Sequence, residues 1–177
     1  MVERFVSDAQ RLQAARLLMQ DVAAAQHVTL TLWRRMGDDR IVLVATEASP
    51  ADLRITMSEG QRLPLLMGAS GRLMAGHLGL DEKRVHDMFK SLRWARPLSF
   101  QTYWREVQRG LRRGYTVDDG YFTAGIRTVA APILGSDGTA AYAISAVTLR
   151  GQLDNAGTER LGQAMHALAA RLANVLL

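Results

Sequence analysis

The sequence of 177 residues contains no cysteine. This absence excludes disulfide scaffolds, thiol nucleophiles, iron–sulfur clusters and zinc sites built from thiolates. The sequence also lacks any apolar run of about eighteen residues, and its polar start at Met1–Gln10 does not resemble a secretory signal. We therefore expect a cytoplasmic protein that has no membrane span.

Sequence motifs of the common enzyme classes are missing as well. There is no dinucleotide fingerprint, phosphate-binding P-loop or zinc-protease helix. The segment Gly68–Gly71 resembles part of a serine-hydrolase elbow, but Arg72 stands where the elbow needs glycine. Asp118 and Asp119 could act as acid and base, although adjacent acidic residues before a glycine are more typical of a solvated turn. We expect neither an enzyme nor a cofactor.

The four histidines are scattered along the chain. His77, Asp81 and His86 would form a metal site only if their short segments folded back on one another. Three ligands without a known spacing are weak evidence, and an amphipathic surface is the favoured interpretation. We therefore predict no metal.

The residues that are present suit one domain with a core, since 48% are hydrophobic and 22% are charged. The net charge of +5 makes an anionic partner worth considering. Arg105, Arg109, Arg112 and Arg113 share one side of a predicted helix, as they would in a helix that contacts DNA. A solvated face is favoured, because no helix-turn-helix accompanies these arginines.

Hydrophobic periodicity predicts a long helix at each end of the chain. Ser7 and Gln10 form a capping-box pattern ahead of a helix over residues 8–26, and Asp154 or Asn155 is the expected N-cap of the last helix. Three further helices are predicted in the middle of the chain, at Ser70–His77, Asp81–Leu92 and Ser99–Arg113.

Runs rich in β-branched and apolar residues predict two antiparallel hairpins. Their four strands are expected at His27–Arg34, Ile41–Thr46, Ile126–Leu134 and Thr139–Leu149. The second hairpin has a favourable Asp-Gly turn at residues 135–138. Leu53–Met57 is predicted as a third strand, which Gly60–Pro64 closes, and Tyr115–Val117 as a short extended segment. Together these elements predict an α+β fold with one antiparallel sheet backed by helices.

A glycine-rich segment lies at the start of one predicted helix. Free backbone N–H groups and the helix dipole make such a start a site for a carboxylate, with Ser70 and Gly71 as the donors. The alternative is that Gly68 and Gly71 only allow a tight entry into the helix.

Two longer segments resemble the signature of the effector-binding domain of IclR-family transcriptional regulators. The first consists of Gly60, Pro64 and Leu65, followed by Gly68–Ala75. The second contains Gly114, Tyr115, Asp118, Gly125, Ile126, Ala130, Ala131, Pro132, Gly138, Ala143, Ile144 and Ser145. Spacing and order agree in both, and the resemblance covers essentially the whole chain.

The resemblance implies a GAF-like fold with long terminal helices, in which residues 1–26 form a linker-type helix and residues 27–177 the effector-binding domain. It also implies a bacterial regulator whose pocket senses a small organic acid and modulates DNA binding by a separate winged-helix domain. We expect that domain outside this chain, which is either an excised effector domain or a stand-alone sensor. The resemblance further implies a homo-oligomer, either a dimer or a tetramer.

The resemblance carries the pocket of the family onto particular positions. These are Ala69, Ser70, Gly71, Asp118, Ile126, Thr128, Ser145 and Val147, with Leu66, Met67 and Tyr121 or Phe122 expected nearby. Family members that bind very small oxoacids usually place a cysteine where Thr128 stands and a serine where Val147 stands. The less polar wall here points to an aromatic or otherwise bulkier carboxylate. Because Asp118 would repel a carboxylate, we assign it to a hydroxyl or hydrated carbonyl at the other end of the ligand.

Two alternative functions stay open at this point. An enzyme on the same fold would use Ser70, Asp118 and Ser145 as its polar cluster, but no base is recognisable near Ser70. A pure dimerisation module would have a vestigial pocket, which the cost of burying unpaired hydroxyl and carboxyl groups disfavours. The isolated chain is expected to bind DNA only weakly and without sequence preference, because its arginines can only neutralise phosphates.

Overall fold

The structure is a computed structural model that describes residues 6–49 and 57–177. Its strands form one antiparallel sheet in the order β3-β2-β1-β6-β5-β4. The strands are β1 (Thr29–Met36), β2 (Arg40–Ala48), β3 (Arg62–Pro64), β4 (Thr116–Asp119), β5 (Ile126–Leu134) and β6 (Ala140–Leu149). The helices are α1 (Asp8–Gln26), α2 (Gly68–His77), α3 (Glu82–Phe89), α4 (Phe100–Arg113) and α5 (Asn155–Leu176). The α+β fold with long terminal helices is therefore confirmed.

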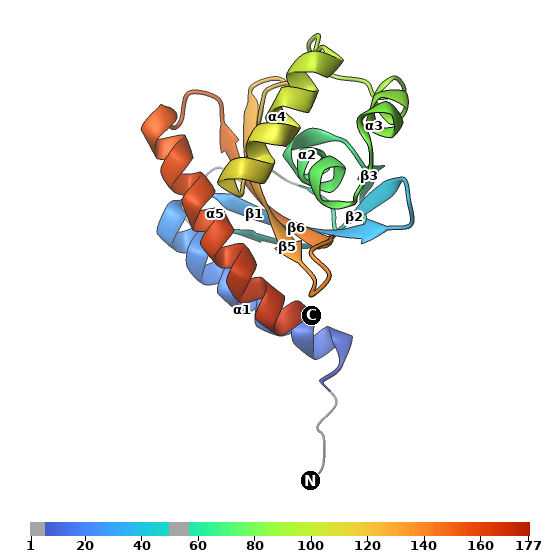
Figure 1. Cartoon of the computed structure of the whole chain (residues 1–177). Helices are drawn as coiled ribbons and strands as arrows, with labels where there is room; N and C mark the ends of the chain where they lie inside the picture. Colours follow the sequence, from blue (N-terminus) through green and yellow to red (C-terminus); the bar gives the residue numbers. More distant parts are fainter. Residues whose placement is uncertain (1–5, 50–56) are drawn as a thin grey trace.

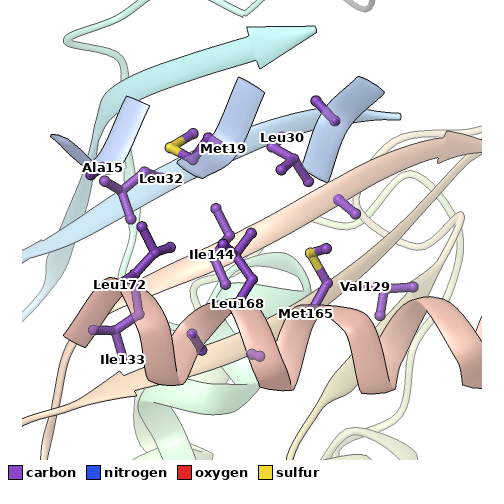
Figure 2. Packing of buried hydrophobic residues seen from close by; sticks show 14 of the residues in the cluster. Ala15, Met19, Leu30, Leu32, Val129, Ile133, Ile144, Met165, Leu168 and Leu172 are labelled. Carbon is purple, nitrogen blue, oxygen red and sulfur yellow. The ribbon is translucent and has the colours of Figure 1, made fainter. Parts of the chain in front are cut away.

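The two terminal helices cover one face of the sheet, where α1 and α5 run side by side (Figure 1). Figure 2 shows how Met19 of α1 and Met165, Leu168 and Leu172 of α5 meet the sheet residues. Every second residue of the central strands points to this face, including Leu30, Leu32, Val129, Ile133, Ile144 and Ala146. Helix α1 therefore shares one core with α5 and the sheet.

Helices α2, α3 and α4 lie on the opposite face (Figure 1). The intervening residues of the same strands point to them, so that Trp33, Ile41 and Ala143 pack against Leu73 of α2 and Tyr103 of α4. The sheet thus carries a core on both faces, and the positions that the sequence assigns to the pocket lie on the α2–α4 face.

The ends of the helices follow the local signals. Ser7 and Gln10 form the expected capping box, and Asp154 rather than Asn155 caps α5 by accepting from the Gly157 amide at 2.7 Å. Helix α4 begins after its N-cap Ser99 and ends at Gly114, whose φ of +85° favours glycine. Strand β5 coincides with the predicted run Ile126–Leu134.

Three sequence-based expectations differ from the structure or fall outside it. Asp118 and Asp119 are not a solvated turn but the last residues of β4, and the turn begins at Gly120. Gly60–Pro64, expected only to close a strand block, contains β3, which pairs with β2. The strand expected at Leu53–Met57 lies outside the described residues, apart from Met57, which has no regular structure.

Ion pairs explain why two adjacent aspartates end a strand. Asp119 accepts from Arg127 at 2.9 Å and from Arg150 at 3.0 Å. Partial burial opposes ionisation of Asp119, but the hydrogen bonds from the two arginines outweigh it and lower the pKa of its carboxyl.

Among the described helices none is both long and apolar enough to cross a bilayer.

Candidate ligand-binding site

A cavity of about 260 Å³ lies between α2 and the sheet face that it covers. Five strands (β1, β2, β3, β5 and β6), several loop residues and the first turn of α2 form its lining. The lining residues are Thr31, Trp33, Ile41, Met57, Gln61, Leu63, Met67, Gly68, Ala69, Ser70, Phe122, Thr123, Ile126, Thr128, Ser145 and Val147. A volume near 300 Å³ is the lower end of the range for small-molecule sites.

The register of the sheet gathers the polar residues of one wall. Ser145 of β6 lies opposite Thr31 of β1, and Val147 of β6 lies opposite Thr128 of β5. All four side chains point to the same face, because side chains alternate along each strand. The spacing Ser145, Val147 on one strand therefore places both residues in the cavity.

The other polar wall is the start of α2. Its N-cap, Met67, makes no side-chain capping hydrogen bond. Among the described residues, the backbone N–H groups of Gly68, Ala69 and Ser70 have no hydrogen-bond partner. Helix geometry leaves these first amides free, and the helix dipole adds partial positive charge there. The cavity thus presents unpaired donors to whatever fills it.

Three hydroxyl groups in the lining are similarly unpaired. The hydroxyls of Ser70, Thr128 and Ser145 make no hydrogen bond within the described part of the chain, and Ser70 and Ser145 are 5% and 3% exposed. The Thr31 hydroxyl, in contrast, accepts from Trp33 Nε1 at 3.0 Å. The three unpaired hydroxyl oxygens are not among the fully buried unpartnered atoms of the described residues, so they keep access to the cavity, where water or a ligand can satisfy them.

Most of the remaining lining is apolar, Gln61 and Thr123 being exceptions, and its described residues include no charged side chain. Aromatic and aliphatic groups surround the polar end, namely Trp33, Ile41, Met57, Leu63, Met67, Phe122, Ile126 and Val147. Such a site combines a few directed donors with a large apolar wall, which is typical of pockets for small organic ligands.

Six of the eight positions assigned from the sequence line this cavity: Ala69, Ser70, Ile126, Thr128, Ser145 and Val147. Met67 and Phe122, expected nearby, line it as well, whereas Leu66 and Tyr121 do not. The sequence reasoning missed the β1 and β2–β3 wall, including Thr31, Trp33 and Gln61. The alternation Thr29, Thr31, Trp33 is a signal that could have found two of these residues once the β1–β6 pairing is known.

Gly71 has a different role from the one expected. Its N–H already donates to the Met67 carbonyl at 3.0 Å, so it is not a free donor. A Cβ atom at this position would lie only 1.9 Å from the Leu66 carbonyl carbon. Gly71 therefore lets α2 approach the preceding chain closely, which is the alternative interpretation of the glycine-rich segment.

Asp118 does not line the cavity either. It is 2% exposed, and its Oδ2 accepts from Arg72 Nη1 at 2.8 Å. Its Oδ1 accepts from the backbone amides of Tyr121 and Phe122, both at 3.1 Å. The assignment of Asp118 to a ligand hydroxyl is therefore not supported, because both of its oxygens are occupied by protein donors.

Arg72 is the buried cation beside this carboxylate. Burial opposes its charge, but the carboxylates of Asp118 and Glu106 outweigh burial, so that the pKa of the Arg72 guanidinium is raised above its ordinary value. Glu106 Oε2 accepts from Arg72 Nε at 2.6 Å. A charged network therefore lies directly behind the first turn of α2.

The other sequence candidates for chemistry stay apart. Within the described residues no group of histidines and carboxylates could hold a metal ion. Asp81 caps α3, and His86 stacks on Phe100 with ring centroids 4.2 Å apart. Burial lowers the pKa of His77, which favours its neutral form.

The arginine face borders a larger surface hollow of about 850 Å³ between α4, β4, β5 and α5. Its lining mixes Arg109, Arg112, Arg113 and Arg127 with Glu106, Asp119 and Glu159. Arg127 already pairs with Asp119, and Arg113 donates to the Tyr115 carbonyl. We place the candidate site at the smaller cavity, because the larger hollow is lined by charges of both signs, of which Arg127 and Asp119 already bind each other.

Solved structures of bacterial transcriptional regulators share this architecture. A regulator from Alicyclobacillus acidocaldarius matches with a TM-score of 0.83 and 26% identity over 94% of this chain and 68% of its own. The Agobacterium tumefaciens repressor BlcR matches with a TM-score of 0.79 and 21% identity over 97% of this chain and 68% of its own. The Thermotoga maritima IclR matches with a TM-score of 0.79 and 18% identity over 98% of this chain and 70% of its own.

No protein with a curated description matches the sequence of this chain. The family model of the C-terminal domain of the bacterial transcriptional regulator IclR, however, matches residues 4–174. That match spans nearly the whole chain and includes both segments on which the resemblance was based. The chain belongs to the IclR family of bacterial transcriptional regulators and corresponds to their C-terminal domain.

Proposed function

We propose that this domain is a non-enzymatic sensor that binds a small organic acid in the cavity at the start of α2. Binding modulates the DNA affinity of a winged-helix domain outside this chain, in the bacterial cytoplasm. The observation that carries the proposal is the cavity itself, in which unpaired amides and hydroxyls face a lining that is mostly apolar and, among the described residues, uncharged. In this arrangement α1, within residues 1–26, acts as the linker helix to the DNA-binding domain, and residues 27–177 hold the effector.

The carboxylate of the effector lies at the first turn of α2. The N–H groups of Ala69 and Ser70 and the hydroxyls of Ser70 and Ser145 supply the donors. Hydrogen bonds to a charged acceptor are stronger than those between neutral groups, and the helix dipole adds to them. Trp33, Phe122 and Val147 then cover the apolar body of the ligand.

The charge of the lining limits the class of acid. No arginine, lysine or histidine is among the described lining residues, so the helix start is the single electropositive element in that part of the cavity. One carboxylate is satisfied there, whereas a second would be buried without a partner at high cost. We therefore propose a monocarboxylate with an aromatic or bulky apolar body.

The same lining argues against the enzyme alternative. An activated serine needs a base within hydrogen-bond reach, and the described lining contains no histidine, lysine or carboxylate. Asp118, the acidic member of the alternative cluster, is bound to Arg72 instead.

A thermal-shift series with benzoate, pyruvate and succinate tests the proposed function. Benzoate at a hundred times its dissociation constant is expected to stabilise the domain by about 2.7 kcal/mol, and succinate is expected to give no shift. Ser145→Ala removes one hydrogen bond to the carboxylate, so the affinity is expected to fall by about 1.5–3 kcal/mol. Ser136→Ala, in the exposed β5–β6 turn, is the matched control and leaves the affinity unchanged. Equal shifts for all three acids would contradict the proposal.

Val147→Ser is expected to move the preference of the cavity toward small oxoacids. The new hydroxyl would face the apolar body of benzoate without a partner, whereas a compact oxoacid can satisfy it. We expect the variant to bind benzoate more weakly and pyruvate more strongly than the parent domain does, as measured by calorimetry on the two proteins. An unchanged ratio of the two affinities would place the ligand away from β6.

We further propose that the domain self-associates as a dimer or tetramer. Leu17 on α1 is 54% exposed and Leu177 at the end of α5 is 48% exposed, which leaves apolar surface on the terminal helices. Light scattering at micromolar concentrations is expected to give a mass of at least two chains. A monomer throughout that range would be the contrary result.

A further inference from the structure

One buried guanidinium connects two parts of the cavity lining without touching the cavity. Arg72 lies on α2 and is fully buried. Its Nη1 donates to the Gly68 carbonyl at 2.9 Å and to Asp118 Oδ2 at 2.8 Å. Gly68 is the first residue of α2 and lines the cavity, whereas Arg72 and Asp118 do not.

Asp118 extends this connection to a second lining segment. Its Oδ1 accepts from the amides of Tyr121 and Phe122, which fixes the chain just before Thr123. Phe122 and Gly68 adjoin each other, since a Cβ built on Gly68 would lie 3.8 Å from Phe122 Cδ1. Both the start of α2 and the aromatic wall at Phe122 are therefore tied to the same ion pair.

The surroundings of Arg72 hold its side chain in one place. The guanidinium carbon lies 5.5 Å from the centre of the Trp94 ring and 5.1 Å from that of Tyr103. Its Nε is taken by Glu106 of α4. With the aromatic rings close by and three acceptors bound, the group cannot turn without giving up charge-assisted hydrogen bonds.

We propose that Arg72 and Asp118 are positioning residues that set the distance between the α2 donors and the Phe122 wall, and thereby the affinity of the cavity for its acid. This inference rests on the proposed function. It gives Asp118, which the sequence suggested as a ligand contact, a role one step behind the ligand. It also separates Asp118 from Glu106, which binds the same guanidinium from α4 but does not line the cavity.

Two isosteric variants distinguish positioning from general stabilisation. Asp118→Asn leaves one oxygen to serve both Arg72 and the two amides, so one of these connections is lost. Glu106→Gln weakens the contact with Arg72 Nε but leaves both cavity segments tied. We expect Asp118→Asn to weaken benzoate binding by about tenfold or more, and Glu106→Gln to change it less than about twofold. Calorimetry measures both affinities, and thermal unfolding measures the stability of each variant.

Amide NMR of the ligand-free domain supplies a measurement that does not depend on the ligand. Asp118→Asn is expected to shift the signals of Gly68, Ala69, Ser70 and Phe122 and to speed hydrogen exchange at the Phe122 amide, whereas Glu106→Gln shifts signals along α4. If the parent domain binds none of the acids, the proposed function fails and these signals still decide the inference.

The inference is overturned if Asp118→Asn leaves the lining signals and the benzoate affinity unaltered, or if Glu106→Gln changes them equally. Arg72→Lys is the second variant, used if Asp118→Asn does not fold. It keeps the charge, but one ammonium cannot reach Gly68, Asp118 and Glu106 together, so it is expected to behave as Asp118→Asn.

Discussion

Arg72→Met is expected to lower the free energy of unfolding by about 3–5 kcal/mol, because it removes the one cation from a buried ionic network. The substitution roughly preserves the length of the side chain, so packing against Trp94 and Tyr103 is largely kept. The loss comes from Asp118, which is 2% exposed and would lose its cation, and from the hydrogen bond that Arg72 Nη1 donates to the Gly68 carbonyl.

Urea unfolding followed by circular dichroism measures this change. Arg105→Met is the matched control, because Arg105 is exposed on α4 and, within the described residues, makes a hydrogen bond only with Thr102. We expect the control to lie within about 0.5 kcal/mol of the parent protein, as surface substitutions usually do. Adding Asp118→Asn to Arg72→Met should recover part of the loss, since it removes the unpaired charge. Equal stability of Arg72→Met and Arg105→Met would refute the account of this network.

Elements with strong local signals were predictable from the sequence nearly to the residue. Helix α4 lies between Ser99, which caps its start, and Gly114, which adopts the left-handed conformation at its end. Strands β5 and β6 follow from apolar alternation around an Asp-Gly turn. In these segments local chemistry and tertiary packing favour the same conformation, so local patterns suffice.

The role of the acidic pair in β4 was not predictable, because its partners lie on other elements and two of them, Arg72 and Arg150, are 46 and 31 residues away. Asp118 binds Arg72, which is 46 residues away, and Asp119 binds Arg127 and Arg150. Without these cations, two adjacent aspartates before a glycine read as a solvated turn. The pairing converts that segment into an edge strand, which is a tertiary effect that overrides local preference.

The candidate site was predictable where it depends on strand alternation and less so elsewhere. Ser145 and Val147 are two residues apart on β6, so any register that buries one buries the other on the same face. The wall formed by Thr31 and Trp33 depends on β1 pairing with β6 across more than a hundred residues of sequence. No short sequence motif predicts that pairing, so the part of the cavity formed by Thr31 and Trp33 was not predictable from the sequence.

The free amides of α2 were predicted at the correct helix, but at Ser70 and Gly71, whereas the unpaired amides are those of Gly68, Ala69 and Ser70. A helix start leaves its first amides unpaired, and here the fourth residue of α2, Gly71, already donates to Met67. The sequence signal at Gly71 is steric instead. Its backbone neighbour is Leu66, whose carbonyl oxygen accepts from the Tyr103 hydroxyl at 2.7 Å and is thereby held in the core.

Gly71→Ala is accordingly expected to destabilise the domain by about 3 kcal/mol or more, the upper end for overpacking, although alanine is the better helix former by about 1 kcal/mol. The added methyl group would lie 1.9 Å from the Leu66 carbonyl carbon and 2.2 Å from its oxygen. These are backbone atoms, so the strain cannot be relieved by a change of rotamer. Either α2 moves off the sheet or the Tyr103 hydrogen bond breaks.

Gly76→Ala on the same helix is the matched control for this prediction. Its methyl group would meet the Leu111 side chain at 3.1 Å, and that side chain is half-exposed and able to move. We expect its stability to stay within about 1 kcal/mol of the parent protein in the same urea titration, because helix propensity offsets a small adjustment. If both glycine variants unfold at the same urea concentration, the close approach of α2 to Leu66 does not determine stability. If only Gly71→Ala unfolds early, substitutions at Gly71 report on folding, and ligand binding must be tested at Ser145 and Val147 instead.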